Sequence, residues 1–444
     1  MIHHQEPICA LATAPGVGAI GVIRVSGLNA IQIVDTIFKG RKLENVKTHT
    51  VHFGTIQKGE KVIDEVLSAV FKSPKSFTKE DTVEISCHGS SFVIKEILKL
   101  LLDNGCRLAK PGEFTQRAFM NGQFDLVQAE AVADLIEADS SAAHNLAINQ
   151  LRGGFSDKLT SLRDELIHFA SMVELELDFG EEDVEFADRD DLKKLIESLQ
   201  SQLNPLIDSF DAGNVIKEGI PVAIIGQPNV GKSTLLNALL KEEKAIVTEI
   251  AGTTRDSIED TMVIRGMKFR FIDTAGIRET IDIVEGIGIE KSKAALQKAQ
   301  IVLFLFDSEA ERTYLEENYT ELAKGKKVFW VKTKADLNET SANADLSISA
   351  KTGEGISELE NILFDSTSIK TQGDTVLTNL RHYDLLIKTN EALTEVLNGL
   401  ALNITGDFLA QDIRLALVHL GELTGTITTD DLLKNIFGKF CIGK

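Results

Sequence analysis

The sequence predicts a chain of mixed α/β and all-α class with several domains: a small N-terminal α/β domain, a discontinuous helical domain, and a second α/β domain inserted into it. Its 444 residues exceed what one hydrophobic core usually organises. Apolar strands alternate with helical stretches in two separate regions, and elsewhere the apolar residues recur with helical spacing. We therefore expect four segments, at 1–122, 123–215, 216–370 and 371–444.

Composition favours a cytoplasmic protein. Hydrophobic residues make up 43% and charged residues 26%, and no apolar run approaches the roughly 20 residues that span a bilayer. The first residues lack the basic start and long apolar region of a secretory signal. The cysteines Cys9, Cys87, Cys106 and Cys441 lie far apart without a CxxC pair, which argues against a zinc site and suits a reducing compartment.

The net charge of −20 opposes unaided attraction to nucleic acid, because the phosphates would be repelled. Any role on RNA therefore needs a local basic patch or a partner. Much of the acidity lies within residues 171–190, where Arg189 is the single basic residue. We interpret this segment as a solvated helix end or linker, with a metal or partner site as the alternative.

Short apolar runs predict the elements of the N-terminal domain. Residues 20–27, 66–72 and 82–89 are expected to form strands, and 92–105 an amphipathic helix that Gly105 closes. This alternation indicates a small α/β domain.

Helical periodicity continues from residue 126 to about 212 and returns after residue 374. Neither stretch is rich enough to form a core alone, so we expect the two to pack together as one domain. The region between them carries apolar strands separated by helix-forming stretches. These strands are predicted at 221–226, 267–273, 301–307, 327–333 and 345–349.

Four short motifs fall at the ends of these strands: GQPNVGKST at 226–234, DTAG at 273–276, TKAD at 333–336 and SAK at 349–351. A lone GxxxxGK[ST] match is only moderately informative, but four elements at these intervals indicate a guanine-nucleotide site. They predict a P-loop domain of the Ras-like G type.

The first motif is suited to hold phosphates. Its backbone N–H groups can wrap them, and the helix that begins near Lys232 points its positive end at them. We expect Lys232 to contact the β and γ phosphates and the Ser233 hydroxyl to bind Mg²⁺, while Gly226 and Gly231 permit the tight backbone. Thr254 would supply the second Mg²⁺ hydroxyl, although loop threonines can also simply cap a turn.

The later motifs predict how the γ phosphate and the base are bound. Asp273 suits a water-mediated contact to Mg²⁺, and Gly276 a backbone N–H to the γ phosphate. The oxygens of Asp336 can accept from N1–H and the exocyclic amine of guanine, which favours GTP over ATP. The Lys334 stem can cover the base, and SAK can donate an N–H to guanine O6. Thr333 replaces the usual asparagine, and we expect a contact of about 1 kcal/mol to be lost or replaced.

No glutamine follows DTAG to orient the attacking water, because Ile277 stands there. Asn229, together with the carbonyls of segment 247–253, could hold a monovalent cation such as K⁺ beside the β–γ bridge, where it would neutralise developing charge. Asn229 could equally stabilise its own loop, and the residues alone leave both interpretations open.

Several segments together resemble a known family: APGVGAIGVIRVSG at 14–27, SFTKEDTVEISCHG at 76–89, KPGEFTQRAFMNGQFDLVQAEAVADLI at 110–136, GTTRDSIED at 252–260, DTAGIRE at 273–279 and FCIGK at 440–444. Along nearly its full length the chain is similar to the MnmE (TrmE) family of tRNA-modification GTPases. Other GTPases share the phosphate loop, whereas the folate-type N-terminal domain, the helical frame and the FCIGK end are peculiar to this family.

The resemblance implies K⁺-stimulated GTP hydrolysis, with Asn229, Thr248, Ile250 and Thr253 around the cation. It also implies that Glu285 orients the water when two G domains meet; by itself the sequence would make Glu285 a solvated carboxylate. The expected GTP-binding residues are Asn229, Val230, Gly231, Lys232, Ser233, Thr234, Thr248, Glu249, Ile250, Ala251, Gly252, Thr253, Thr254, Asp273, Thr274, Ala275, Gly276, Lys334, Asp336, Ser349, Ala350 and Lys351.

The resemblance further implies that the N-terminal domain dimerises and binds 5-formyl- or methylene-tetrahydrofolate. The matching positions are Arg24, Glu84, Gln123 and Lys444. Arg24 can meet the folate glutamate or a carbonyl, and Glu84 can accept from the pterin N–H edge. Gln123 stands where some members carry lysine. Without the resemblance, Arg24 and Glu84 would be ordinary charges at the end of a sheet.

The implied function is a K⁺- and Mg²⁺-dependent GTPase that drives modification of the wobble uridine (U34) of tRNA. It would add an aminomethyl or carboxymethylaminomethyl group at C5 together with an FAD-dependent partner protein, in a heterotetramer. A GTPase switch in ribosome assembly, without covalent RNA modification, is the alternative, and a folate-binding scaffold is a third. Cys441 is discounted as a nucleophile, because no local histidine activates it and its Phe-Cys-Ile surroundings predict a packed, buried thiol.

Overall fold

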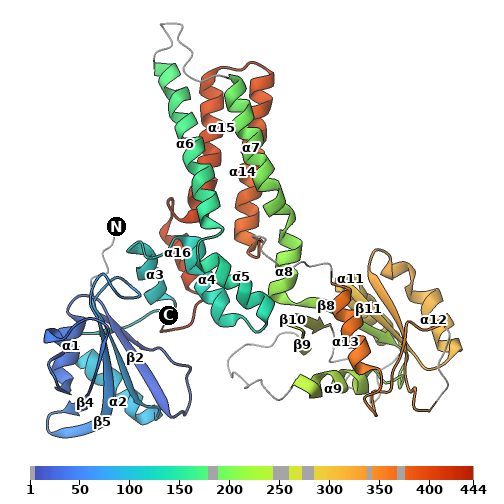
Figure 1. The fold of residues 1–444 in the computed structure, drawn as a ribbon, viewed down its shortest axis with the longest axis horizontal. Helices are drawn as coiled ribbons and strands as arrows, with labels where there is room; N and C mark the ends of the chain where they lie inside the picture. The colour runs from blue at the N-terminus through green and yellow to red at the C-terminus, as the bar shows by residue number, and fades with distance from the viewer. Residues whose placement is uncertain are drawn as a thin grey trace. The chain divides into compact units, whose positions relative to one another are not determined.

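The computed structural model describes residues 6–178, 189–243, 260–272, 285–337, 343–367 and 376–443 (Figure 1). The chain divides into two compact units. The first comprises Met1–Ile136, Asn149–Ile196 and Lys388–Lys444, and the second comprises Glu137–Ile148 and Glu197–Ile387. Each unit has a sheet of its own. Among the described helices, none is long and apolar enough to cross a membrane.

Within the described residues, the sheet of the first unit has seven strands in the order β3-β4-β5-β6-β2-β1-β7. Its pairs are antiparallel except β1 with β7. Helices α1 (Ala30–Ile37) and α2 (Ser91–Asp103) share one hydrophobic core with the strands. The strands are β1 (Ile8–Leu11), β2 (Ile20–Ser26), β3 (Phe38–Gly40), β4 (Thr50–Lys58), β5 (Lys61–Phe71), β6 (Thr82–His88) and β7 (Arg107–Leu108).

Three predicted strands of this domain are confirmed as β2, β5 and β6. The predicted helix is confirmed as α2, and Gly105, with φ of 100°, follows its end. On the face of β4 and β5 that points away from the core, Phe53 is 65% exposed and lies opposite Leu67, which is 47% exposed. The sheet is therefore packed on one face and displays apolar side chains on the other.

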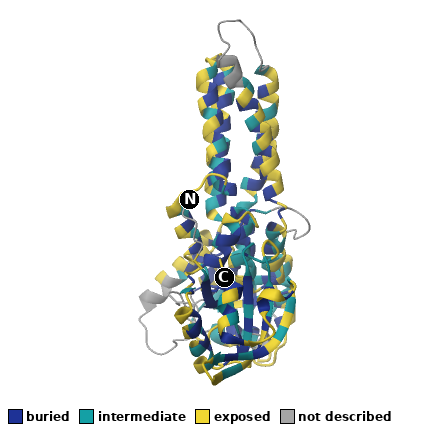
Figure 2. Ribbon diagram, turned by 90° about the vertical axis from the view of Figure 1, so that its left-hand side faces the viewer, coloured by how far each residue is buried: buried dark blue, intermediate teal, exposed yellow. Residues whose placement is uncertain are grey.

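Helices from two distant parts of the sequence pack together in the first unit. Helix α6 (Ser156–Asp178) lies against α15 (Gly406–Thr424), with Leu159, Leu166 and Ile413 among their buried residues (Figure 1). In the described helices of this part, buried residues face inward and exposed residues face outward (Figure 2). The predicted discontinuous helical packing is confirmed, while residues 179–188 of the acidic segment lie outside the described ranges.

The other helices of the predicted helical segments are α4 (Leu126–Glu137), α5 (Ser141–Leu151), α7 (Arg189–Asp208), α8 (Phe210–Glu218) and α14 (Leu380–Ala401), and α8 lies wholly in the second unit. Helices α7 and α14 each have residues in both units. Residues 137–148 belong to the second unit, where the backbone N–H of Ala142 donates to the carbonyl of Gly266 at 3.1 Å and Asp139 pairs with Lys268 at 2.7 Å. The limits of the compact units therefore differ from the limits of the predicted segments. The predicted domain boundaries stay a prediction.

The C-terminal residues return to the N-terminal domain within the first unit. Phe437, the last residue of α16 (Asp430–Phe437), shares a hydrophobic cluster with Leu126 and Ala129 of α4. Gly112 precedes α3 (Glu113–Met120) with φ of 63°, and a Cβ there would lie 2.5 Å from the carbonyl oxygen of Phe437. Only glycine allows this approach, so the start of α3 is shaped to receive α16.

Within the described residues, the second sheet has six strands in the order β13-β12-β11-β8-β10-β9, parallel except for the edge strand β9. Side chains alternate along β8: Ile224 joins the core with α9 and α13, whereas Ala223 joins the core with α11 and α12. Helices on both faces explain why this strand is apolar throughout. The elements are β8 (Ile220–Gly226), α9 (Lys232–Glu243), β9 (Asp260–Ile264), β10 (Met267–Phe271), α11 (Glu285–Lys298), β11 (Ile301–Phe306), α12 (Glu309–Tyr319), β12 (Lys327–Lys332), β13 (Leu346–Ser347) and α13 (Ile356–Asp365).

Four predicted strands of this domain are confirmed as β8, β10, β11 and β12. The predicted strand at 345–349 is shorter than expected, since β13 covers only Leu346–Ser347. The doubly wound sheet confirms the predicted inserted α/β domain, and it places the ends of β8, β11 and β12 along one edge.

Candidate nucleotide and N-terminal sites

The phosphate loop follows β8, the strand between β11 and β10. Gly226 ends the strand, and a Cβ there would lie 2.7 Å from the carbonyl oxygen of Leu305, so the backbone passes where only glycine fits. Asn229 has φ of 65° and Gly231 φ of 109°, which turn the loop back toward α9. Between them, the buried Val230 anchors the loop in the core.

Lys232 lies across this loop. Its ammonium donates to the carbonyl oxygens of Gly226 at 2.6 Å and Gln227 at 2.9 Å. Burial lowers the pKa of Lys232, and the carboxylate of Glu311 works in the opposite direction. Ser233 and Thr234 follow in the first turn of α9, whose N–H groups point toward the loop. A cation and a helix N-terminus therefore meet at one loop, which is the arrangement that binds phosphate.

Thr333 connects the phosphate loop to the loop that carries TKAD. Its hydroxyl donates to the carbonyl oxygen of Val230 at 2.7 Å, and its backbone N–H donates to Phe306 at 2.8 Å. Thr333 is 4% exposed, so both bonds are made away from water. Thr333 thus joins the two loops through its hydroxyl, and the loss or replacement of the asparagine contact stays a prediction.

The two base-binding motifs also meet. The hydroxyl of Ser349, in SAK, donates to Oδ1 of Asp336 at 2.8 Å, and the backbone N–H of Ala335 donates to the carbonyl of Ile348 at 3.0 Å. Ser349 is fully buried, which fixes the carboxylate of Asp336 against the SAK loop. The other two residues of the SAK motif follow Ser349 in the same loop. Ala350 packs against the core and Lys351 is exposed.

Two residues near this site are absent from the predicted motifs. Asp307 Oδ2 pairs with Lys334 Nζ at 2.6 Å, and the Glu311 side chain accepts from the backbone N–H of Asp307 at 2.8 Å. Glu311 follows Ser308, the N-cap of α12, in an S-x-x-E pattern typical of a helix start. That pattern was the available sequence signal for Glu311.

Other predicted residues lie outside the described ranges. They are Thr248, Glu249, Ile250, Ala251, Gly252, Thr253, Thr254, Asp273, Thr274, Ala275, Gly276 and Lys444. Glu285 is the first residue of α11, but its side chain is not among those described. The roles expected for these residues stay predictions.

The predicted N-terminal site centres on Arg24 and Glu84, which are register partners on β2 and β6. Arg24 Nε donates to Oε1 of Glu84 at 2.9 Å, and Nη1 lies 3.4 Å from the carbonyl oxygen of Gly443. The guanidinium also lies 5.5 Å from the ring centres of both Phe77 and Phe114. Gly443 of the FCIGK segment therefore lies beside the predicted pair.

Gln123 is exposed just after α3. The next residue, Phe124, places its ring 5.6 Å from that of Phe77, which also lies near Arg24. Lys444, outside the described residues, follows Gly443 in sequence. The residues described here thus gather polar and aromatic groups from both ends of the chain at one place.

The expectation that Cys441 is buried is wrong. Cys441 is exposed, whereas Cys9, Cys87 and Cys106 are buried. Its backbone carbonyl accepts from the N–H of Gly112 at 3.3 Å, so the main chain is held while the thiol faces water.

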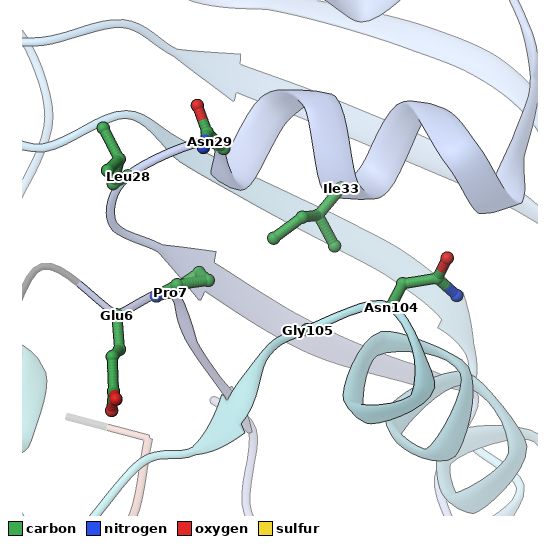
Figure 3. Close-up of a pocket in the computed structure, with 7 residues that line it drawn as sticks. All are labelled: Glu6, Pro7, Leu28, Asn29, Ile33, Asn104 and Gly105. Atoms are coloured by element: carbon green, nitrogen blue, oxygen red, sulfur yellow. The ribbon is translucent and has the colours of Figure 1, made fainter.

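A separate cavity of 480 Å³ lies between the start of β1, the start of α1 and the end of α2 (Figure 3). Its lining residues are Glu6, Pro7, Leu28, Asn29, Ile33, Asn104 and Gly105. None of the predicted site residues lines it.

A phosphate loop after a central parallel strand, tied by Thr333 to a base loop in which Ser349 holds Asp336, defines a P-loop protein with a G domain. Residues 7–123 match the N-terminus of the GTP-binding protein TrmE, and residues 126–441 match the MnmE helical domain. The tRNA modification GTPase MnmE of Cytophaga hutchinsonii is 56% identical over 100% of this chain and 98% of its own length. The tRNA modification GTPase MnmE of Christiangramia forsetii is 52% identical over 99% of both chains, and that of Flavobacterium psychrophilum 52% over 100% of both. The chain belongs to the MnmE family of tRNA modification GTPases.

Proposed function

We propose that this GTPase requires K⁺ and acts in the cytoplasm to modify the wobble uridine (U34) of tRNA. GTP hydrolysis would drive addition of an aminomethyl or carboxymethylaminomethyl group at C5, together with an FAD-dependent partner in a heterotetramer. One observation carries the nucleotide part: the Thr333 hydroxyl joins the phosphate loop to the base loop at 2.7 Å, so one rigid edge presents both Lys232 and Asp336.

Each part of the nucleotide has a proposed partner in this chain. Lys232 binds the β and γ phosphates, and Asp336 accepts from the guanine N–H groups. Mg²⁺ would be held by the hydroxyls of Ser233 and Thr254, and it would neutralise charge on the phosphates. Glu285 would orient the attacking water.

The K⁺ site is proposed at Asn229, Thr248, Ile250 and Thr253. Asn229 supports this assignment because its backbone is left-handed, with φ of 65°, and its side chain is exposed beside the phosphate loop. An amide oxygen there is the hard ligand that an alkali cation prefers.

GTP hydrolysis in KCl and in NaCl at equal ionic strength tests the K⁺ proposal. Asn229→Gly removes the side chain but accepts the same φ, so the loop should keep its shape. We expect strong stimulation by K⁺ in the wild type and its loss in Asn229→Gly, with GDP affinity retained. Asn229→Asp, which also tolerates this φ and keeps an oxygen ligand, serves as the matched control. Full K⁺ stimulation of Asn229→Gly would reject Asn229 as a ligand.

A homodimer is proposed through the N-terminal sheet. The exposed cross-strand pair Phe53 and Leu67, together with Val51 at 61% exposure, forms an apolar surface on β4 and β5. A Phe53→Glu variant should shift the protein toward monomer in analytical ultracentrifugation. An unchanged sedimentation coefficient would place the dimer contact elsewhere.

Binding of 5-formyl- or methylene-tetrahydrofolate is proposed at Arg24, Glu84, Gln123 and Lys444. The Arg24–Glu84 pair beside the phenylalanine rings supports it, because a pterin needs both polar edges and a stacking surface. Calorimetry with 5-formyl-tetrahydrofolate should show binding that Glu84→Gln weakens, whereas Glu65→Gln on the exposed part of β5 should not. No binding at millimolar ligand would reject the folate assignment.

Mass spectrometry of tRNA nucleosides separates the proposal from the ribosome-assembly alternative. Cells lacking this protein should lose the C5 group at U34 and regain it on complementation. If U34 is unchanged while ribosomal subunits accumulate unassembled, the alternative function is correct.

A further inference from the structure

The end of β11 carries a charge cluster that the four nucleotide motifs do not include. Asp307 Oδ2 lies 2.6 Å from Lys334 Nζ, with the two side chains 25% and 37% exposed. The carboxylate of Glu311 accepts from the backbone N–H of Asp307 at 2.8 Å. The N–H of Glu311 in turn donates to the N-cap hydroxyl of Ser308. The start of α12 thus holds the backbone of Asp307, and the Asp307 carboxylate lies next to the Lys334 ammonium.

The cluster lies at the edge where a nucleotide would bind. Strands β11 and β12 are parallel, with Phe306 opposite Lys332, so Asp307 and the base loop leave the sheet side by side. Open α/β sheets bind ligands outside the carboxyl ends of their strands. Lys334 has a left-handed φ of 58°, and its ammonium is held at Asp307, so its methylene stem is stretched along this edge.

We propose that Asp307 is a positioning residue for guanine recognition, because it anchors the Lys334 ammonium and thereby holds the lysine stem as a preformed face for the purine ring. Glu311 supports this geometry by fixing the Asp307 backbone. A lysine without an anchor would lose its rotamer freedom only when the nucleotide binds, and that loss would weaken binding. The inference rests on the proposed binding of guanine by Asp336.

A double-mutant cycle tests the anchor. Asp307→Asn removes the charge with little change in shape, and Lys334→Met keeps an unbranched stem without the ammonium. Dissociation constants for GDP and for IDP, which lacks the 2-amino group, are measured by calorimetry. We expect Asp307→Asn to weaken GDP and IDP equally, by about tenfold, because a charged hydrogen bond that organises the stem is lost.

The cycle also predicts how the two changes combine. In the Lys334→Met background, Asp307→Asn should have no further effect beyond about twofold, because its partner is already gone. Lys334→Arg keeps an ion pair with Asp307 and should stay within about threefold of wild type. If Asp307→Asn does not fold, the comparison of Lys334→Arg with Lys334→Met still decides, since equal affinities of these two would overturn the proposal.

Three further results would overturn it: unchanged GDP affinity in Asp307→Asn, an equal loss with and without the Lys334 ammonium, or a changed ratio of GDP to IDP affinity. The last would mean that the variant disturbs Asp336 rather than the stem. Asp336→Asn tests the base site separately, because its amide should prefer xanthosine diphosphate, which has a carbonyl at C2. Failure of that switch rejects the guanine site itself and not merely the role of Asp307.

Discussion

Glu113 and Arg117 stand one turn apart on α3, and Oε1 of the first lies 3.1 Å from Nη2 of the second with both residues 4% exposed. Arg107 reaches the same carboxylate at 2.6 Å, and Arg117 also pairs with Glu80 at 3.3 Å. Burial alone would raise the pKa of Glu113, but hydrogen bonds from Arg107 and from the N–H of Lys110 outweigh it and lower the pKa to about 2. The network therefore depends on an ionised Glu113.

Glu113→Gln should lower the free energy of unfolding of the first unit by about 3 kcal/mol at pH 7, because the buried guanidinium of Arg117 and the half-buried one of Arg107 lose the carboxylate that they share. The folded pKa lies below the unfolded value of about 4.3, so this stabilisation is complete above that value and is lost as pH falls toward 2. Urea unfolding at pH 7 and pH 3 should show the variant with the smaller pH dependence. Asp431→Asn, in a surface pair with Lys434, is the control and should change little. Equal stability of Glu113→Gln and wild type at pH 7 would contradict the prediction.

Thr333→Val should weaken GDP binding by about tenfold and destabilise the second unit by about 1–2 kcal/mol, because the buried carbonyl of Val230 loses its donor. Thr333→Ser keeps the hydroxyl and should bind GDP within about threefold of wild type. Fluorescence titration with a labelled GDP and thermal unfolding measure both effects. If Thr333→Val and Thr333→Ser bind GDP with equal affinity, the hydroxyl bond has no part in nucleotide binding.

Glu311→Gln should stabilise the second unit at alkaline pH. Burial raises the pKa of Glu311, and the neighbouring Asp307 carboxylate adds to the rise. The folded protein therefore binds the Glu311 proton more tightly than the unfolded chain does. The stabilisation that comes from this proton is lost as pH rises through the folded pKa. A glutamine keeps an oxygen for the N–H of Asp307 and carries no charge, so a melting temperature about 2 °C higher at pH 8 is expected, with no difference near pH 4. A rise of the same size at both pH values would exclude ionisation as the cause.

One thiol should react quickly with a thiol reagent in the folded protein, because Cys441 is exposed while Cys9, Cys87 and Cys106 are buried. Cys441→Ser should abolish the fast phase, and denaturant should expose the remaining three. A fast phase that survives in Cys441→Ser would mean that a buried cysteine opens readily. Complete loss of tRNA modification in a folded Cys441→Ser protein would give this thiol a chemical role.

The sequence predicted elements whose signal is local. Strands β8 and β11 are continuous apolar runs because helices cover both faces of their sheet. The phosphate loop was predicted because its glycines and Lys232 are adjacent in sequence. The strands β1, β3, β4, β7 and β9 were not predicted. Of these, β3 and β7 have only three and two residues, which is too few to show a period.

Individual side-chain contacts between distant residues were not predicted. Asp307 pairs with Lys334 because β11 and β12 are neighbours in the sheet. No local sequence pattern indicates which strands are neighbours. The hydroxyl bond of Thr333 to Val230 depends on the same packing. The environment of Cys441 was mistaken because Phe440 and Gly443 make the packed contacts of the tail while the thiol between them faces water.

The contact of α16 with Gly112 has a consequence for how the protein is made. Residues of the second unit up to Ile387 leave the ribosome before the last part of the first unit, Lys388–Lys444, has been translated. The G domain can therefore fold on the nascent chain before α15, α16 and the FCIGK segment, which belong to the first unit, have been translated. A polypeptide that ends before α15 would contain the segments of the nucleotide unit but lack the helices that pack against α6 and α3.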